Sequence, residues 1–251
     1  MPSGNGARTE QLKLDLHIHT LDDEKDALDY TAHQLLERAQ AVGIEVLAIT
    51  LHDAVFSRRE VFEDAASMGI LLIPAAEMRL RGADVVLLNV TAEEVAPLRD
   101  FEDVRQLRAK RGASIFTFAP HPFYVMGGSI GGRRLEENID CFDAIEICHF
   151  HKGIFDRNRP AREVGARYGK PLLATSDAHR LNAFGAHYTS IPRPAEVTPE
   201  SVFAALRGGL GELTSPPCSF ANLISTFFFL FVIHPIRQRQ RGSSTPAHAH
   251  A

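Results

Sequence analysis

The sequence has few cysteines and no excess of basic charge. Its three cysteines, Cys141, Cys148 and Cys218, occur in 251 residues at spacings that fit neither a disulfide framework nor a CxxC site. The formal net charge is -4, so no basic field is available to hold duplex DNA through phosphate contacts. We therefore expect a cytoplasmic protein that does not bind duplex DNA stably.

Secretion signals and nucleotide-binding loops are also missing. Residues 1–11 are polar, have no apolar core behind a basic start, and are predicted to be disordered. The glycine-rich loop at 127–132 fits neither GxGxxG nor the Walker pattern, so we interpret it as a flexible loop near the active site.

What the sequence does contain is a series of apolar, β-like runs that end in His, Asp or Glu. In the first run, residues 12–20, alternation places His17 and His19 on the same face of a strand, where two imidazoles can share one metal ion. Four later runs repeat this arrangement and end at His52-Asp53, Glu77, His121 and Asp177-Ala178-His179.

Helical segments separate these runs. Apolar spacing and a closing glycine predict helices at 31–42 and 58–68, each followed by a continuous apolar run typical of a parallel strand covered on both faces. About seven β-α repeats result, which predicts a single α/β domain over 12–215 with a parallel sheet. The expected ligand groups all follow predicted strands, where barrel enzymes carry their chemistry.

These nitrogen and oxygen donors include no thiolate, which suits Zn, Mn or Fe and is more typical of hydrolysis than of structural sites. The set is too large for one tetrahedral ion, so we expect at least two ions and a bridging carboxylate, for which Glu77 is the best candidate. Its members are His17, His19, His52, Glu77, His121, Asp177 and His179.

Taken in order, these motifs resemble the PHP superfamily, the polymerase and histidinol phosphatase group of metal-dependent phosphoesterases. The resemblance runs over residues 12–191. It rests on the segments 15–20 (DLHIHT), 48–53 (AITLHD), Glu77, His121-Pro122, 145–147 (IEI) and 176–179 (SDAH).

The resemblance implies a distorted (β/α)7 TIM-like barrel of the PHP type that holds two or three divalent ions. One ion would be bound by His17, His19, Glu77 and Asp177, and a second by Glu77 and His121. His52 and His179 would bind a third ion or flank the substrate.

The chain departs from the family pattern at two places. Leu51 stands where an Asp is usual, and residues 22–25 (DDEK) replace a Ser-Asp-Gly loop. Spacing favours Glu24 as the acidic ligand in this loop, with Asp22, Asp23 and Asp26 as alternatives. Members of the family carry either a polar residue or a metal-binding histidine at the position of His149, which is therefore a candidate for both metal binding and catalysis.

The predicted reaction is hydrolysis of a phosphate ester by metal-activated water. The substrate would be a small phosphorylated metabolite, a nucleotide or a nucleic-acid end. Asp53, His179 and His149 are candidate proton donors to the leaving oxygen. Arg180 is favoured as a phosphate-binding residue over the other candidates, which are Arg133, Arg134, Arg157 and Arg159.

Two other functions are consistent with the same residues. An amidohydrolase-like C–N hydrolase also begins with His-x-His on a barrel strand, but such sites commonly recruit a lysine or further histidines. A non-catalytic metal-binding module, tethered by the C-terminal tail, would have lost several ligands. The ligand set is retained here, so the phosphoesterase is the preferred prediction.

The tail, residues 216–251, differs from the rest in composition. Its apolar stretch at 220–233 contains Asn222 and Ser225 and is shorter than the roughly 20 residues of a spanning helix. Three interpretations stay open: a docked terminal element, an interfacial membrane anchor, and an atypical C-terminus.

Overall fold

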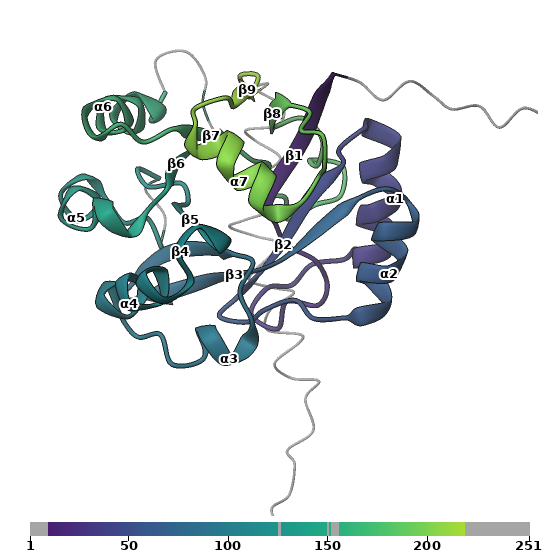
Figure 1. The fold of residues 1–251 in the computed structure, drawn as a ribbon, viewed down its shortest axis with the longest axis horizontal. Coiled ribbons are helices and arrows are strands. Elements are labelled where there is room, and N and C mark those ends of the chain that lie inside the picture. Colours follow the sequence, from purple (N-terminus) through teal and green to yellow (C-terminus); the bar gives the residue numbers. More distant parts are fainter. Residues whose placement is uncertain (1–9, 125–126, 150, 152–155, 219–251) are drawn as a thin grey trace, which may run out of the picture.

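The computed structural model describes residues 10–124, 127–149, 151 and 156–218. These residues form one mixed α/β unit in which a nearly closed, barrel-shaped sheet is surrounded by helices (Figure 1). The apolar stretch at 220–233 lies outside the described residues. Among the described helices, none combines the length and hydrophobicity needed to cross a bilayer.

The sheet has nine strands in the order β7-β6-β5-β4-β3-β2-β1-β8-β9. Their bounds are β1 Gln11–Ile18, β2 Val46–His52, β3 Leu71–Leu80, β4 Ala83–Leu88, β5 Phe116–Ala119, β6 Ala144–Ile147, β7 Leu172–Ala174, β8 Tyr188–Pro192 and β9 Glu212–Thr214. The pairs β1–β2, β2–β3, β5–β6 and β6–β7 are parallel. The expected α/β barrel is thereby confirmed.

The regular β-α repeat is interrupted at two points. β4 runs antiparallel to both β3 and β5, because a tight turn at Arg81 and Gly82, with φ of 51° and 81°, joins β3 directly to β4. β8 and β9 add an antiparallel pair beside β1. The uninterrupted series of parallel repeats was therefore wrong, and the barrel is distorted at these places.

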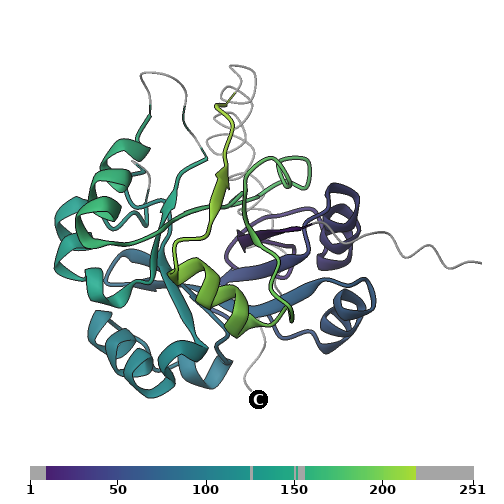
Figure 2. The same cartoon turned by 45° about the horizontal axis from the view of Figure 1, so that its top comes forward.

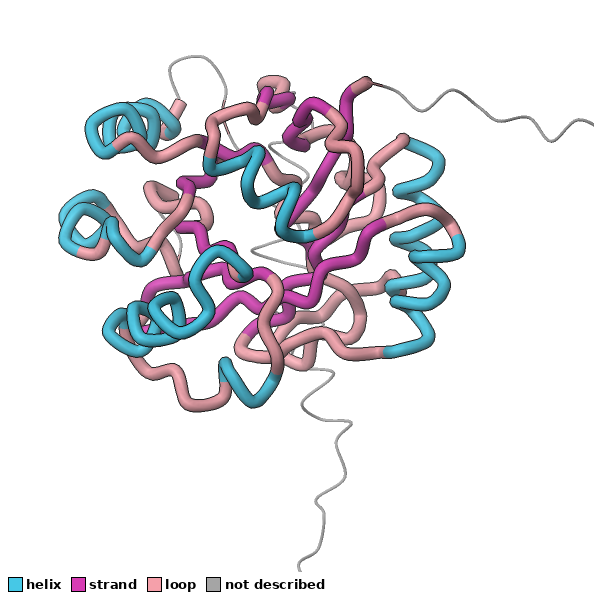
Figure 3. The backbone as a smooth tube through the Cα atoms, in the orientation of Figure 1, coloured by secondary structure: helices cyan, strands magenta, loops and turns pink. Residues whose placement is uncertain are grey.

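Helices cover the outside of the barrel, as Figures 2 and 3 show from two directions. Their bounds are α1 Ala32–Val42, α2 Arg59–Ser67, α3 Ala92–Val95, α4 Phe101–Arg111, α5 Gly132–Glu137, α6 Asn158–Tyr168 and α7 Pro199–Arg207, with short 3-10 turns at Gly112–Ser114 and Ile139–Cys141. Helix α1 begins where Thr31 accepts a hydrogen bond from the Gln34 N–H and ends at Gly43 in the left-handed conformation. The predicted loop at 127–132 continues into α5, which the sequence did not indicate.

The inside of the barrel is apolar, and α7 packs across one end of it. Side chains from alternate positions of β1, such as Leu12 and Leu14, share a buried cluster with Val202, Phe203 and Leu206 of α7. Hydrophobic burial on this scale is the main stabilising contribution to such a core. Since α7 fills this end, the opposite end, where the parallel strands terminate, carries the polar site.

A threonine hydroxyl connects β7, at one edge of the open sheet, to β8, which lies next to the other edge strand β9. Thr189 on β8 is fully buried, and its hydroxyl lies 3.0 Å from the N–H and 2.9 Å from the carbonyl of Ala174 on β7. Close by, the Asp177 N–H donates to the carbonyl of His17 at 3.0 Å. The last part of the barrel is thus attached to the first strand by a few specific hydrogen bonds.

Candidate metal centre

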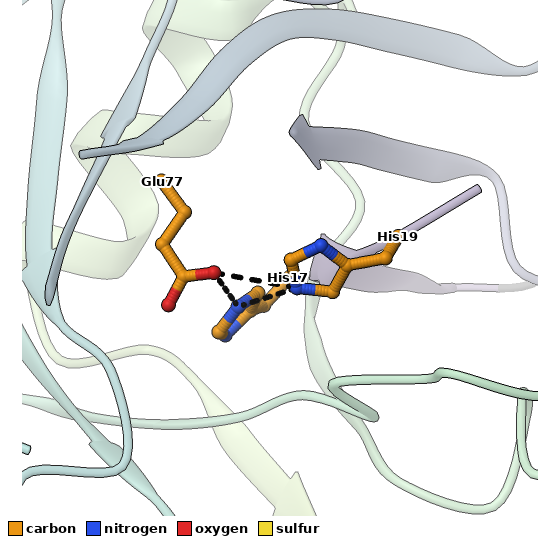
Figure 4. Close-up of side chains that lie close together, drawn as sticks. All are labelled: His17, His19 and Glu77. Atoms are coloured by element: carbon orange, nitrogen blue, oxygen red, sulfur yellow. Dashed lines mark hydrogen bonds and ion pairs between the residues drawn. The ribbon is translucent and has the colours of Figure 1, made fainter. Parts of the chain in front are cut away.

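The centre is built from side chains at the ends of the barrel strands. His17 lies at the end of β1, where the register with β2 shifts between Asp15 and Ile18. A register shift of this kind re-aims side chains, and here Leu16 faces the barrel interior while His17 and His19 converge above it. Figure 4 shows the two imidazoles meeting Glu77 from β3.

Three further residues at this end have strained backbones. Asp53, His121 and Asp177 have φ of 55°, 30° and 44°, a region that non-glycine residues seldom occupy. Conformations of this kind cost of order 1–3 kcal/mol each and persist where the surrounding structure fixes them. Each of these three residues lies one to three positions after the end of a strand, at the mouth of the barrel.

The donor atoms lie at the spacing that a bound ion requires. The Nε2 atoms of His17 and His19 are 3.3 Å apart, and each is 3.3 Å from Oε2 of Glu77. Oδ1 of Asp177 is 3.6 Å from Nε2 of His17 and 3.5 Å from that of His19. Two donors about 2.0–2.2 Å from a tetrahedral ion are about 3.3–3.6 Å apart. These residues therefore fit a zinc-like divalent ion.

Glu77 also reaches the neighbouring histidines. Its Oε2 is 3.4 Å from Nε2 of His52, and its Oε1 is 3.4 Å from Nε2 of His121. His121 and Glu77 form a further donor group with Asp84, a buried carboxylate on β4. The two oxygens of Glu77 thus face different histidines, an arrangement compatible with the predicted bridging role.

Two more donor groups share His19. One combines it with Asp23 and His52, the other with Asp177 and His179. His179 lies 3.0 Å from Asp26 through Nε2. The structure thus brings the seven sequence-predicted donors into one connected cluster of four overlapping groups.

The acidic loop contributes different residues from the one that spacing favoured. Glu24 is exposed, whereas Asp23 and Asp26 are buried. Oδ2 of Asp23 lies 3.2 Å from Nδ1 of His19 and 2.7 Å from Nδ1 of His52. Asp23 and Asp26, which were the alternatives, lie beside the cluster and Glu24 does not, because the turn after Thr20 directs these two carboxylates inward and Glu24 outward.

Glu146 on β6 is a site residue that the sequence reasoning did not assign. It is buried, and its Oε1 lies 2.9 Å from Nδ1 of His17 while its Oε2 accepts from the His121 N–H at 2.6 Å. The Thr175 hydroxyl donates to the same carboxylate. A carboxylate on Nδ1 leaves Nε2 of His17 available and fixes the ring. The IEI segment that contributes to the resemblance was the available signal.

Burial alone lowers the pKa of His17, but the Glu146, Glu77 and Asp177 carboxylates outweigh it and raise that pKa well above its usual value. The same competition raises the pKa of His121 to about 9. Carboxylates packed this densely demand positive charge, which either protons or metal cations can supply. The electrostatics therefore agree with the donor spacing.

Asp53, His149 and Arg180, predicted to donate a proton or to bind phosphate, are not part of these donor groups. Asp53 pairs with Lys25 and accepts from the Arg79 N–H at 2.7 Å. Burial lowers the pKa of His149 to about 4, and its ring lies 5.5 Å from that of His187. Neither Asp53, His149 nor Arg180 belongs to a donor group among the described residues.

A glycine allows the loop before α5 to approach the centre. Gly128 has φ of +100°, and a Cβ there would lie 1.6 Å from Oδ2 of Asp84. The Asp84 N–H donates to the Gly128 carbonyl at 2.7 Å. Only a residue without a side chain fits at this contact, so the glycine-rich loop is anchored to the strand that carries Asp84.

The barrel carries a histidine- and carboxylate-rich centre at its strand ends, and comparison with known proteins finds similar chains. Residues 155–209 match the family model described as PHP-associated. An uncharacterized protein of Methanocaldococcus jannaschii is 23% identical over 147 residues, which cover 55% of this chain and 84% of that protein.

Solved structures share the fold at low sequence identity. A two-domain protein of Bacteroides vulgatus that contains a predicted PHP-like metal-dependent phosphoesterase is 18% identical, with a TM-score of 0.62 over 81% of this chain and 64% of its own. PsfC of Pseudomonas syringae is 17% identical, with a TM-score of 0.62 over 94% of this chain and 100% of its own. The lesion-specific endonuclease PfuEndoQ of Pyrococcus furiosus is 15% identical, with a TM-score of 0.59 over 87% and 66%.

These similarities confirm the resemblance to PHP proteins that the ordered motifs indicate, and they establish a PHP-type fold. The chain spans about two thirds of the Bacteroides and Pyrococcus chains.

Proposed function

We propose that this protein is a metal-dependent phosphoesterase. The observation that carries the proposal is the convergence of His17, His19, Glu77 and Asp177. The two histidine Nε2 atoms lie 3.3 Å from each other and 3.3–3.6 Å from the carboxylate oxygens. The PHP-type fold supports the same conclusion. Two or three ions of Zn, Mn or Fe suit the nitrogen and oxygen donors.

When bound, divalent ions lower the pKa of coordinated water and neutralise phosphoryl oxygens. The chain's own residues orient the donors: Glu146 holds Nδ1 of His17, and Asp23 holds Nδ1 of His19 and His52. Each contact leaves Nε2 directed toward the centre. His179, Asp53 and His149 are the candidates for delivering a proton to the leaving oxygen.

The proposed substrate class is a small phosphorylated metabolite, a nucleotide or a nucleic-acid end, acted on in the cytoplasm. The structural similarity to a lesion-specific endonuclease is compatible with a nucleic-acid end. The C–N hydrolase is the contrasting prediction, and an amide substrate tests it alongside phosphate esters.

The test begins with protein stripped by a chelator and reloaded with Mn²⁺ or Zn²⁺. Hydrolysis of p-nitrophenyl phosphate or its bis-ester is expected only after reloading. Glu77→Gln should remove bound metal and lower the rate at least about a hundredfold. The matched control is Glu63→Gln on α2, an exposed carboxylate paired with Arg59.

Full activity after thorough chelation would reject the metal mechanism. Full metal content in Glu77→Gln would reject its bridging role. Hydrolysis of the amide but of neither phosphate ester would favour the C–N hydrolase.

A further inference from the structure

The arginines considered as phosphate-binding residues are mostly engaged elsewhere. Arg133 and Arg159 are 92% and 83% exposed, and each pairs with a glutamate one turn along its own helix. Arg134 donates to the Leu80 carbonyl and stacks on Phe101. Other contacts thus hold these three guanidinium groups, so another cation near the strand ends is a candidate to bind an anionic substrate.

Lys25 lies in the acidic loop, between two residues that contact the cluster. Its neighbours Asp23 and Asp26 approach His52 and His179. The Lys25 N–H donates to Oδ1 of Asp23 at 2.9 Å, while the other oxygen of the same carboxylate contacts His19 and His52. The backbone of Lys25 is thus hydrogen-bonded directly to the Asp23 carboxylate, which orients two histidines.

The side chain of Lys25 extends over the ends of β2 and β3. Its ammonium pairs with Oδ2 of Asp53, which directly follows His52. Asp53 is itself fixed, because its N–H donates to the Glu77 carbonyl at 2.8 Å and its Oδ1 accepts from the Arg79 N–H. The fixed partner holds a positive charge on the side of the centre where Glu77 and His52 meet.

This ion pair can exchange partners at low cost. Lys25 is 56% exposed and Asp53 is 27% exposed, so solvent screens the pair and it contributes little to stability. A phosphate group carries more charge than a carboxylate and offers more acceptor oxygens. We propose that Lys25 binds the phosphate group of the substrate, and that its ammonium leaves Asp53 when the anion arrives.

This inference rests on the proposed function, since it names the group that recognises the substrate of that site. It assigns Asp53 a role as the resting partner of the lysine. Asp53 then competes with the substrate for one ammonium, so the two side chains should have opposite effects on anion affinity.

The experiment measures the dissociation constant of inorganic phosphate by calorimetry on metal-loaded full-length protein, with metal content determined for each variant. Lys25→Met should weaken phosphate binding about tenfold or more, the loss expected for one charge-assisted hydrogen bond. Asp53→Asn should tighten it, because the amide keeps the acceptor for the Arg79 N–H and tolerates positive φ but no longer competes for the ammonium. Lys110→Met, on the exposed end of α4, should leave binding unchanged.

If the ion pair were only structural, both Lys25→Met and Asp53→Asn would weaken phosphate binding. That result would overturn the proposal. Unchanged affinity in Lys25→Met would overturn it as well. Either result leaves the hydrolysis of phosphate esters by the wild-type protein to its own test, so the two failures are distinguishable.

Discussion

At the scale of single residues, the orientation of His17 depends on Glu146. This buried carboxylate accepts from the His121 N–H and the Thr175 hydroxyl and contacts Nδ1 of His17. Glu146→Gln keeps the shape of the side chain but replaces one carboxylate oxygen with an NH2 group. This group is a hydrogen-bond donor and would face groups that are donors themselves. We expect metal affinity to fall about 10–100-fold.

A competitive chelator titration measures that change, with Glu63→Gln as the control for a glutamate outside the centre. Wild-type affinity in Glu146→Gln would show that His17 is held by other means. Because the readout is metal binding, the result does not depend on which substrate the protein hydrolyses.

The same residue shows where sequence reasoning stops. His17, His19 and the later donors could be predicted because each ends an apolar run, and the carboxyl ends of parallel strands meet at one edge. Glu146 and Asp23 could not be assigned, because their roles depend on which way a strand or turn points a side chain. Asp23 and Glu24 are adjacent in this loop, yet the first is buried and the second is exposed.

At the scale of elements, the direction of β4 could not be read from its composition. An apolar run covered on both faces looks alike in parallel and antiparallel strands. Gly82 was the available signal for a hairpin, since glycine readily adopts the positive φ that it has in this turn. The helices, in contrast, followed from apolar spacing and from caps such as Thr31 and Gly43.

Helices α4 and α7 are tied to the start of β6 by one carboxylate. Asp143 accepts from Arg108 at 2.6 and 3.0 Å and from Arg207 at 3.0 Å. Burial alone raises the pKa of Asp143, but the two guanidinium groups outweigh it and lower that pKa below its usual value of 3.8. The ionised form is therefore the stabilising one.

Asp143→Asn should lower the free energy of unfolding by about 2–3 kcal/mol at neutral pH. A group with a lowered pKa stabilises the fold above its unfolded value and loses this effect as the pH falls through the folded value. The difference between wild type and variant should narrow below about pH 4. Urea unfolding between pH 3 and 7 measures it, with exposed Asp64→Asn as control, and a pH-independent difference would contradict the explanation.

At the scale of the whole molecule, Thr189 closes the barrel. Thr189→Val keeps the volume but leaves the N–H and carbonyl of Ala174 without the hydroxyl that they contact. Unsatisfied buried polar groups cost about 1–3 kcal/mol each, so we expect the free energy of unfolding to fall by at least about 1 kcal/mol. Thr214→Val on β9 is the matched control. Equal stability of Thr189→Val and the wild type would show that the contact between β7 and β8 does not depend on the hydroxyl.

The hydrogen bond from Asp177 to the carbonyl of His17 also bears on how the protein is made. The first strand is synthesised with its two histidines long before residue 177 leaves the ribosome, so the set of His17, His19, Glu77 and Asp177 is completed only late in synthesis. In the proposed centre, full metal affinity therefore waits for the last part of the barrel, and a chain interrupted before β7 should bind metal more weakly than the whole chain.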